Sequence, residues 1–147
     1  MESLEDRIRH HEGKVNKLYK DSLGKATVGI GHLIREDEKD EWKEGVEYSD
    51  EVIEKVFKED LEIATTLCDN MFMCDLSYKP PKLLREIYIE MIFQLGAGGV
   101  SKFKKTFDYV KMKKFKHASI EMLDSRWNKQ TPNRAKALSD LMATVTV

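Results

Sequence analysis

A chain of 147 residues with 41% hydrophobic and 35% charged side chains has the length of one domain and enough apolar residues for a packed core, which excludes a largely disordered protein. The net charge of −1 argues against a nucleic acid as partner. The charge is unevenly spread, however: the first 77 residues hold 11 basic and 20 acidic side chains, and the other 70 hold 14 and 6. Either these are solvated surfaces of opposite sign, or the basic part attracts an anionic polymer.

The cysteines and the N-terminus indicate where the protein is made. Cys68 and Cys74 are too few for a disulfide framework and lack the spacing of a zinc site, so we expect free thiols in a reducing compartment. The N-terminus has no apolar signal-peptide core, and no apolar run approaches the ~20 residues that span a membrane. We therefore expect a protein made inside a cell, with no stable membrane association.

The first fifty residues predict a helix and a hairpin. A capping signal at Ser3 opens a short helix that ends at Glu12 and Gly13. A β-like stretch over 15–20, a turn over 21–25 and a second stretch over 26–32 predict a β-hairpin. We expect the acidic residues 35–47 to form a surface loop or short helix, in which Trp42 either stacks on a sugar or anchors the loop locally.

The rest of the chain predicts helices. Ser49 caps a long helix that runs to about Asp69, with an inward face formed at helical spacing by Ile53, Phe57 (or Val56), Asp60, Ala64 and Leu67. After Pro80 and Pro81, residues 83–95 are apolar on nearly every side, as in a buried central helix. Glycines over 96–99 end it, and shorter helices are expected near 103–112, 115–124 and 133–144. The order predicts an α+β fold, mostly α: a small lobe with a β-hairpin sheet, a long connecting helix and an all-α lobe, with a groove that suits an extended substrate.

Two acidic residues in the first part of the chain have a setting that suits catalysis. Glu12 lies where a helix meets a loop, Asp21 lies in the hairpin turn, and Thr27 lies on the returning strand. The fold-back of the hairpin can bring the three to one edge. Hydrolysis of a glycosidic bond needs one carboxylic acid to protonate the leaving oxygen and a second carboxylate to act on water or on the sugar cation.

The surroundings of these residues resemble a known family. The spacing Glu12-x8-Asp21-x5-Thr27 lies within His11-Glu12-Gly13, Tyr19-Lys20-Asp21 and Thr27-Val28-Gly29-Ile30-Gly31-His32. Phe93-Gln94-Leu95-Gly96, Ser125-Arg126-Trp127 and Gln130-Thr131-Pro132-Asn133-Arg134-Ala135 follow in order. This pattern resembles the phage-type lysozymes, glycoside hydrolase family 24, and is most similar to their T-even bacteriophage members. The resemblance implies a single lysozyme-like domain over 1–147. Its lobes would span approximately 13–59 and 70–147, joined by a helix over 49–69, with the 1–12 helix packing on the C-terminal lobe.

The resemblance implies a role for each matching residue. Glu12 would be the general acid, and Asp21 with Thr27 would position and activate a water, with inversion at the sugar. Leu33 and Phe93 would line the saccharide groove, and Thr106 stands where the family often has a serine that contacts sugar. Gln130 and Arg134 belong to the motif that closes the groove near Glu12. Arg134 there would favour ionised Glu12, whereas an acid catalyst works better with a raised pKa.

The chain also departs from the T-even pattern. The segment 35–48 is shorter by about a helix, and the C-terminus stops early. Glu121 stands where those relatives have an asparagine that contacts substrate, so a polar contact becomes a charge.

Histidines offer alternative sites. His32 is either a catalytic base or, at the end of a strand, a structural hydrogen-bonding residue paired with Asp60. His10 and His11 are adjacent, so their side chains diverge, which argues against a metal site.

The resulting hypothesis is a monomeric muramidase without metal or cofactor that acts on peptidoglycan. It would accumulate in a host cytoplasm and reach the wall after a holin-type opening of the membrane. The alternatives are a catalytically silent peptidoglycan-binding module and a lytic transglycosylase. Glu12, Asp21 and Thr27 argue against the first, and Asp21 with Thr27 favours hydrolysis over the second.

Overall fold

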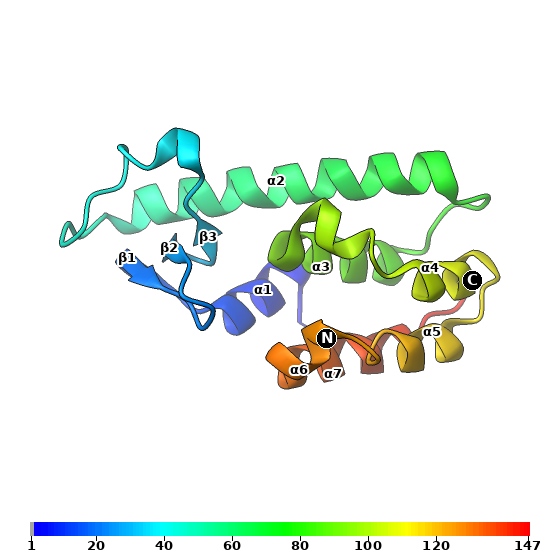
Figure 1. The fold of residues 1–147 in the computed structure, drawn as a ribbon. Helices are drawn as coiled ribbons and strands as arrows, with labels where there is room; N and C mark the ends of the chain where they lie inside the picture. Colours follow the sequence, from blue (N-terminus) through cyan, green and yellow to red (C-terminus); the bar gives the residue numbers. More distant parts are fainter. Residues whose placement is uncertain (1) are drawn as a thin grey trace. The chain divides into compact units, whose positions relative to one another are not determined.

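The computed structural model describes residues 2–147 and divides into two compact units, Met1–Ile63 (unit 1) and Ala64–Val147 (unit 2). Unit 1 contains a helix, three short strands and a 3-10 turn, and unit 2 contains helices (Figure 1). Helix α2, Asp50–Asp75, begins in unit 1 and ends in unit 2. The prediction of a mostly helical α+β fold is confirmed.

Helix α1, Leu4–Glu12, opens unit 1 and is fixed at both ends. The Ser3 side chain accepts a hydrogen bond from the Asp6 backbone N–H at 3.1 Å, as the capping signal predicts. Gly13, at a φ of 70°, ends the helix and donates to the Arg9 carbonyl. One guanidinium nitrogen of Arg9, Nη1, also donates to both carboxylate oxygens of Glu54 of α2, and the guanidinium lies 4.6 Å from the centre of the Phe57 ring. These contacts hold the end of α1 against the first half of α2.

The hairpin continues into a third strand. Strands β1 (Val15–Lys20), β2 (Ala26–Gly29) and β3 (His32–Leu33) form an antiparallel sheet in the order β1-β2-β3 (Figure 1). Thr27 of β2 pairs with Tyr19 on one side and with Leu33 on the other. Because directly opposed residues point to the same face of a sheet, these three side chains share one face. Val28 and His32, also paired, point to the opposite face.

The acidic segment after the sheet is anchored locally. It contains a 3-10 turn, η1 (Glu36–Glu38), followed by Trp42, which packs edge-on against Tyr48 at 4.8 Å between ring centres. Trp42 also donates its indole N–H to Glu38 at 2.8 Å. The interpretation of Trp42 as a local anchor is therefore confirmed.

Helix α2 ends at Asp75, six residues beyond the end predicted at Asp69. Residues 70–75 contain neither glycine nor proline, and Phe72 extends the buried stripe by one more turn. The assignment of Leu67 to this stripe is wrong, because Leu67 is exposed. Cys68 lies on the stripe in its place, with Ile53, Phe57, Ala64 and Phe72. Cys68 is a buried free thiol and Cys74 an exposed one.

Unit 2 is built around helix α3, Lys82–Val100, whose middle, from Ile87 to Ile92, is buried on every side. Tyr88 packs against Phe72 and Phe107 at centre distances of 5.1 and 5.8 Å. Gly96 leaves the helical conformation with φ 74°, so the predicted break at the glycines is present as a kink within α3. The remaining helices are α4 (Lys104–Lys111), α5 (Phe115–Glu121), α6 (Arg126–Gln130) and α7 (Pro132–Met142).

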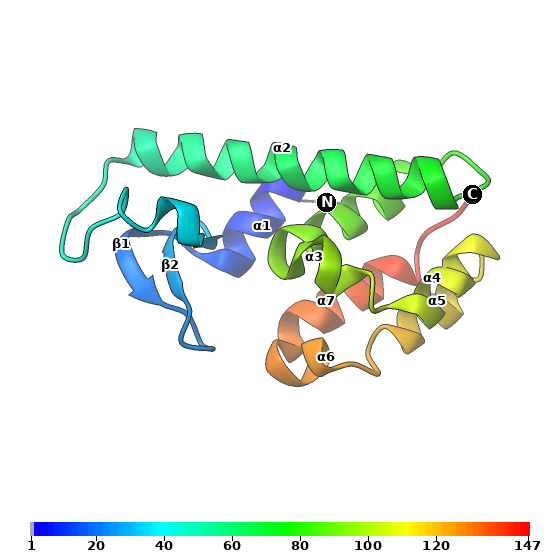
Figure 2. The same cartoon turned by 45° about the horizontal axis from the view of Figure 1, so that its top comes forward.

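The short helices of unit 2 pack in pairs. Helix α4 contacts α5, and α7 contacts α3, α5 and α6 (Figure 2). Helix α6 was not predicted; Ser125 caps it by accepting from the Asn128 backbone N–H. Over residues 2–147, no helix has the length and apolarity needed to cross a membrane.

Candidate active site

Glu12 is the last residue of α1, and its half-buried carboxyl group lies directly against Gly31. A β-carbon placed on Gly31 would come within 2.6 Å of both Cδ and Oε1 of Glu12. Gly31 also has a φ of 68°, a conformation that glycine adopts without steric cost. The backbone of the turn between β2 and β3 is therefore in close contact with this carboxyl group on one side.

Asp21 follows β1 and organises the hairpin turn. Its Oδ1 accepts hydrogen bonds from the backbone N–H groups of Leu23 at 2.9 Å and Lys25 at 2.8 Å. Its backbone N–H donates to the Lys25 carbonyl. Among the described residues, no donor reaches Oδ2. One carboxylate oxygen thus fixes the orientation of the group, and the other stays available to bind a water.

Thr27 is 2% exposed, and its hydroxyl donates to the Lys25 carbonyl at 2.9 Å. Because the proton of this hydroxyl is directed at the carbonyl, its oxygen lone pairs can accept a hydrogen bond from a water. The same turn residue, Lys25, thus orients both Thr27 and Asp21.

Tyr19 is a site residue that the sequence did not single out. It pairs directly with Thr27 across the sheet. Burial raises the pKa of its hydroxyl above the ordinary value, and the carboxylates of Glu12 and Asp21 raise that pKa further. The tyrosine therefore lies within the electrostatic field of both acids. Its position within Tyr19-Lys20-Asp21 and its place on the face of Thr27 were the available signals.

His32 has a structural setting. Its Nδ1 is 2.7 Å from Oδ2 of Asp60, which confirms the predicted pair, and its Nε2 is 2.6 Å from Oε1 of Glu38, which was not predicted. Burial lowers the pKa of His32, but the hydrogen bonds and charges of the two carboxylates outweigh burial and leave it raised. Burial likewise raises the pKa of Glu38, and bonds from His32 and Trp42 outweigh it and leave that pKa lowered. The imidazolium form can donate to both acids, so it ties β3 to η1 and α2.

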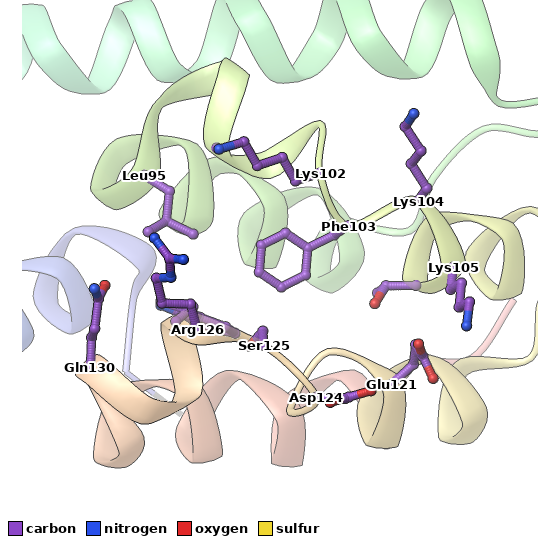
Figure 3. A pocket seen from close by; sticks show the side chains of 13 residues that line it. Leu95, Lys102, Phe103, Lys104, Lys105, Glu121, Asp124, Ser125, Arg126 and Gln130 are labelled. Atoms are coloured by element: carbon purple, nitrogen blue, oxygen red, sulfur yellow. The ribbon is translucent and has the colours of Figure 1, made fainter.

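Three of the predicted substrate residues meet in unit 2. Thr106, Glu121 and Gln130 line one pocket of about 520 Å³, together with residues of α3, α4, α5 and α6 (Figure 3). The sequence did not predict the aromatic floor of this pocket, Phe103 and Trp127, which pack edge-on at 5.8 Å between ring centres. Trp127 is fixed by a hydrogen bond from its indole N–H to Gln94 at 2.8 Å.

The other predicted substrate residues do not line that pocket. Leu33 belongs to unit 1, where it is 42% exposed on the sheet face of Thr27. Phe93 is half-buried in α3. Arg134 is buried, and its Nε donates to Glu90 at 3.2 Å. Glu90, fully buried in α3, is a further residue that the sequence did not single out; an acid among apolar neighbours, between Ile89 and Met91, was the signal for a buried partner.

Comparisons with known proteins show which family the chain resembles over its length. Residues 9–142 match the family model described as Phage lysozyme. Two proteins of Dictyostelium discoideum, "Probable T4-type lysozyme 2" and "Probable T4-type lysozyme 1", are each 32% identical over 163 residues, which covers 99% of this chain and 96% of each relative. The "Pre-baseplate central spike protein Gp5" of Enterobacteria phage T4 is 27% identical over 163 residues, which covers 97% of this chain but 28% of that protein.

The matched sequence and the fold together define a glycoside hydrolase of the lysozyme class. The chain belongs to the phage lysozyme family, as the spacing of Glu12, Asp21 and Thr27 predicts. Membership of this family implies peptidoglycan as the substrate.

Proposed function

We propose that the protein hydrolyses the β-1,4 bond between N-acetylmuramic acid and N-acetylglucosamine in peptidoglycan, with Glu12 as the proton donor. The observation that carries this proposal is the contact between Glu12 and Gly31. A general acid must hold its proton within hydrogen-bond reach of the leaving oxygen. A carboxyl group backed by a turn without a side chain has a restricted set of positions, which suits this task.

Asp21 and Thr27 supply the water. The hydroxyl oxygen of Thr27 and the Oδ2 of Asp21 hold it, and Asp21 takes its proton as the water oxygen bonds to the anomeric carbon. At the same time the bond from that carbon to the glycosidic oxygen breaks, and the proton of Glu12 goes to this oxygen. The configuration at the anomeric carbon is inverted. This mechanism expects the Glu12 and Asp21 carboxyl groups to be roughly 6.5–9.5 Å apart during the reaction.

Two other functions compete with this proposal. A silent peptidoglycan-binding module has no need for Asp21 to be fixed by two backbone N–H groups beside an oriented Thr27 hydroxyl. A lytic transglycosylase closes an anhydro ring on the sugar itself, so it needs no group that activates a water. Both considerations favour hydrolysis.

The biological setting follows as part of the same proposal. The protein acts as a monomeric phage endolysin, made in a host cytoplasm and released to the wall by a holin-type opening of the membrane. Its bacteriolytic action then comes from cleavage of the glycan strand by carboxyl chemistry, without a metal or cofactor.

Analysis of the products tests the proposal. Purified peptidoglycan is digested and the new sugar ends are identified by mass spectrometry and by NMR within the first turnovers. The proposal expects reducing N-acetylmuramic acid ends that appear first as the α-anomer. Initial β-anomer would overturn inversion, anhydro ends would indicate a transglycosylase, and intact strands would leave only a binding module.

A further inference from the structure

A tyrosine lies directly beside Thr27 in unit 1. In the sheet, Thr27 of β2 is opposite Tyr19 of β1 and opposite Leu33 of β3. Opposed side chains of an antiparallel sheet have β-carbons about 4.5–5.5 Å apart, so Tyr19 and Leu33 flank the Thr27 side chain on its two sides. Of these two neighbours, only Tyr19 has a polar atom in its side chain. A hydrogen-bond donor therefore shares the sheet face of Thr27.

The same tyrosine is close to both acids of the site. Asp21 follows Tyr19 by two residues, directly after the end of β1, and residues two apart along a strand lie on the same side of the sheet. Besides burial, the charges of Glu12 and Asp21 both raise the pKa of the Tyr19 hydroxyl, so this hydroxyl lies within the range of both carboxylates. A raised pKa also keeps the hydroxyl protonated and able to donate.

The proton of this hydroxyl is not used within the described part of the chain. None of residues 2–147 forms a hydrogen bond with the Tyr19 hydroxyl, although the hydroxyls of two other half-buried tyrosines, Tyr48 and Tyr78, each bond to a backbone group. The Thr27 hydroxyl, by contrast, already donates to a backbone carbonyl. At this face of the sheet, Thr27 and Asp21 can thus accept hydrogen bonds, and Tyr19 can donate one.

An attacking water has a use for one donor beside two acceptors. In the proposed mechanism, the water donates one hydrogen to Thr27 and the other to Asp21. Its oxygen has two lone pairs, and one of them attacks the anomeric carbon. If the other lone pair accepts a hydrogen bond, the water is held by three contacts, the usual number for a buried water, and its remaining lone pair is directed at the carbon.

We infer that Tyr19 is a third ligand of the attacking water and donates its hydroxyl hydrogen to the water oxygen. The inference rests on the proposed function, because it takes the water held by Thr27 and Asp21 as the nucleophile. Tyr19 keeps its proton throughout: Asp21 takes the proton that the water loses, and the hydrogen bond from Tyr19 strengthens as the water oxygen gains negative charge. Tyr19 is then a catalytic residue for the attack of water and has no part in the departure of the leaving group.

Tyr19→Phe tests this role, because it removes the hydroxyl and keeps the ring beside Thr27. The kcat on peptidoglycan should fall about 10- to 100-fold, the effect of one hydrogen bond to a group that gains charge, with KM unchanged because the substrate loses no contact. The unfolding temperature should stay the same. Tyr109→Phe makes the same change at a half-buried tyrosine of α4 and should match the wild type. An unchanged kcat in Tyr19→Phe, or a rise in KM alone, would overturn the inference.

A glycosyl fluoride separates the attack of water from the departure of the leaving group. The substrate is the disaccharide of N-acetylglucosamine and N-acetylmuramic acid with a β-fluoride at the anomeric carbon of the muramic acid. Fluoride leaves with the bonding electrons and needs no proton, and its release is followed with an electrode. Tyr19→Phe should lose the same factor in rate on this substrate as on peptidoglycan, because both reactions need the water. Glu12→Gln should lose far less on the fluoride than on peptidoglycan.

The outcomes distinguish this inference from the proposed function. A Tyr19→Phe variant that regains the wild-type rate on the fluoride would assign Tyr19 to the leaving group and overturn the inference. An equal loss of rate on both substrates by Glu12→Gln would overturn Glu12 as the proton donor and leave the role of Tyr19 standing. A wild type that cuts neither substrate would overturn the proposed function.

Discussion

The carboxyl group of Glu12 and the α-carbon of Gly31 are in such close contact that no side chain fits between them. A β-carbon on Gly31 would lie 2.6 Å from Cδ and from Oε1 of Glu12. The carboxyl group belongs to the end of a helix and the glycine to a turn of the sheet, so this contact places the acid beside the strands that carry Thr27 and Leu33.

Gly31→Ala should therefore impair catalysis more than stability. The methyl group would displace the Glu12 carboxyl, and a displacement of about 1 Å costs on the order of 100-fold in rate. A non-glycine residue at this positive φ adds about 1–2 kcal/mol of strain. Lytic rate and urea unfolding are measured on the same preparation. Gly45→Ala is the matched control, because Gly45 has a φ of 81° and open space around its Cβ position. We expect Gly31→Ala and Gly45→Ala to lose similar amounts of stability, but only Gly31→Ala to lose lytic rate. If Gly31→Ala were as active as the wild type, the contact with Gly31 would not be needed to position Glu12.

Two substitutions of Asp21 should distinguish its contribution to catalysis from its contribution to stability. In Asp21→Asn the amide oxygen can still accept from the N–H groups of Leu23 and Lys25, so the turn persists, but the residue can no longer take a proton from water. We expect a rate loss of about 10²-fold or more with little change in stability. Asp21→Ala should lose the same activity and, with both hydrogen bonds, a further 1–3 kcal/mol or so of stability. Lytic activity retained by Asp21→Asn would remove Asp21 from the mechanism.

The His32 cluster should give stability a characteristic pH dependence. The pKa of His32 is raised above 6.5, so its contribution is complete below that value and is lost as pH rises through the higher folded pKa. The pKa of Glu38 is lowered below 4.5, so its contribution is present above that value and is lost as pH falls through the lower folded pKa. The cluster therefore stabilises unit 1 most between these two values.

Glu38→Gln measures this contribution. The loss of unfolding free energy should be about 2 kcal/mol at pH 5.5, typical of hydrogen bonds to charged groups, and smaller at pH 9. Glu36→Gln, an exposed change in the same 3-10 turn, should have little effect at either pH. A loss for Glu38→Gln that does not vary with pH would show that the His32 charge is not involved.

Salt should weaken lysis through the basic residues of unit 2. Lys111, Lys114 and Lys116 are exposed, and screening shortens their range from roughly 10 Å at 0.1 M salt to about 3 Å at 1 M. Lysis of whole walls should fall over that range, while cleavage of a neutral chitooligosaccharide should change little. Reversal of all three lysines to glutamate should lower wall lysis and flatten its salt dependence. The same reversal at Lys43, Lys55 and Lys58 of unit 1 should change neither the rate of wall lysis nor its salt dependence. Unchanged lysis after reversal of Lys111, Lys114 and Lys116 would show that these lysines have no electrostatic role in lysis.

Local patterns in the sequence predicted the elements well, and side-chain partners poorly. The capped helix before Glu12, the hairpin and the His32–Asp60 pair all follow from short-range signals. Glu38 lies in a run of acids that resembles a solvated surface, and only the fold shows that it is buried against His32.

The end of α2 and the pocket of unit 2 also depend on contacts between residues that are distant in the sequence. Helix α2 runs past Asp69 because Phe72 finds an aromatic cluster to pack against. The pocket of unit 2 assembles residues from four helices whose positions relative to one another no local periodicity specifies. Thr106, Glu121 and Gln130 were predicted only through the family resemblance, and their common pocket was not.

The role of Glu12 is tested most directly by the lytic activity of Glu12→Gln, measured as the rate of clearing of a peptidoglycan suspension. Glu5→Gln, an exposed change on the same helix, is its control. The amide keeps the shape of the side chain but cannot donate the required proton. We predict that Glu12→Gln unfolds at the wild-type temperature and clears the suspension at least about 100-fold more slowly, while Glu5→Gln matches the wild type. Clearing by Glu12→Gln at the wild-type rate would contradict the assignment of Glu12 as the general acid.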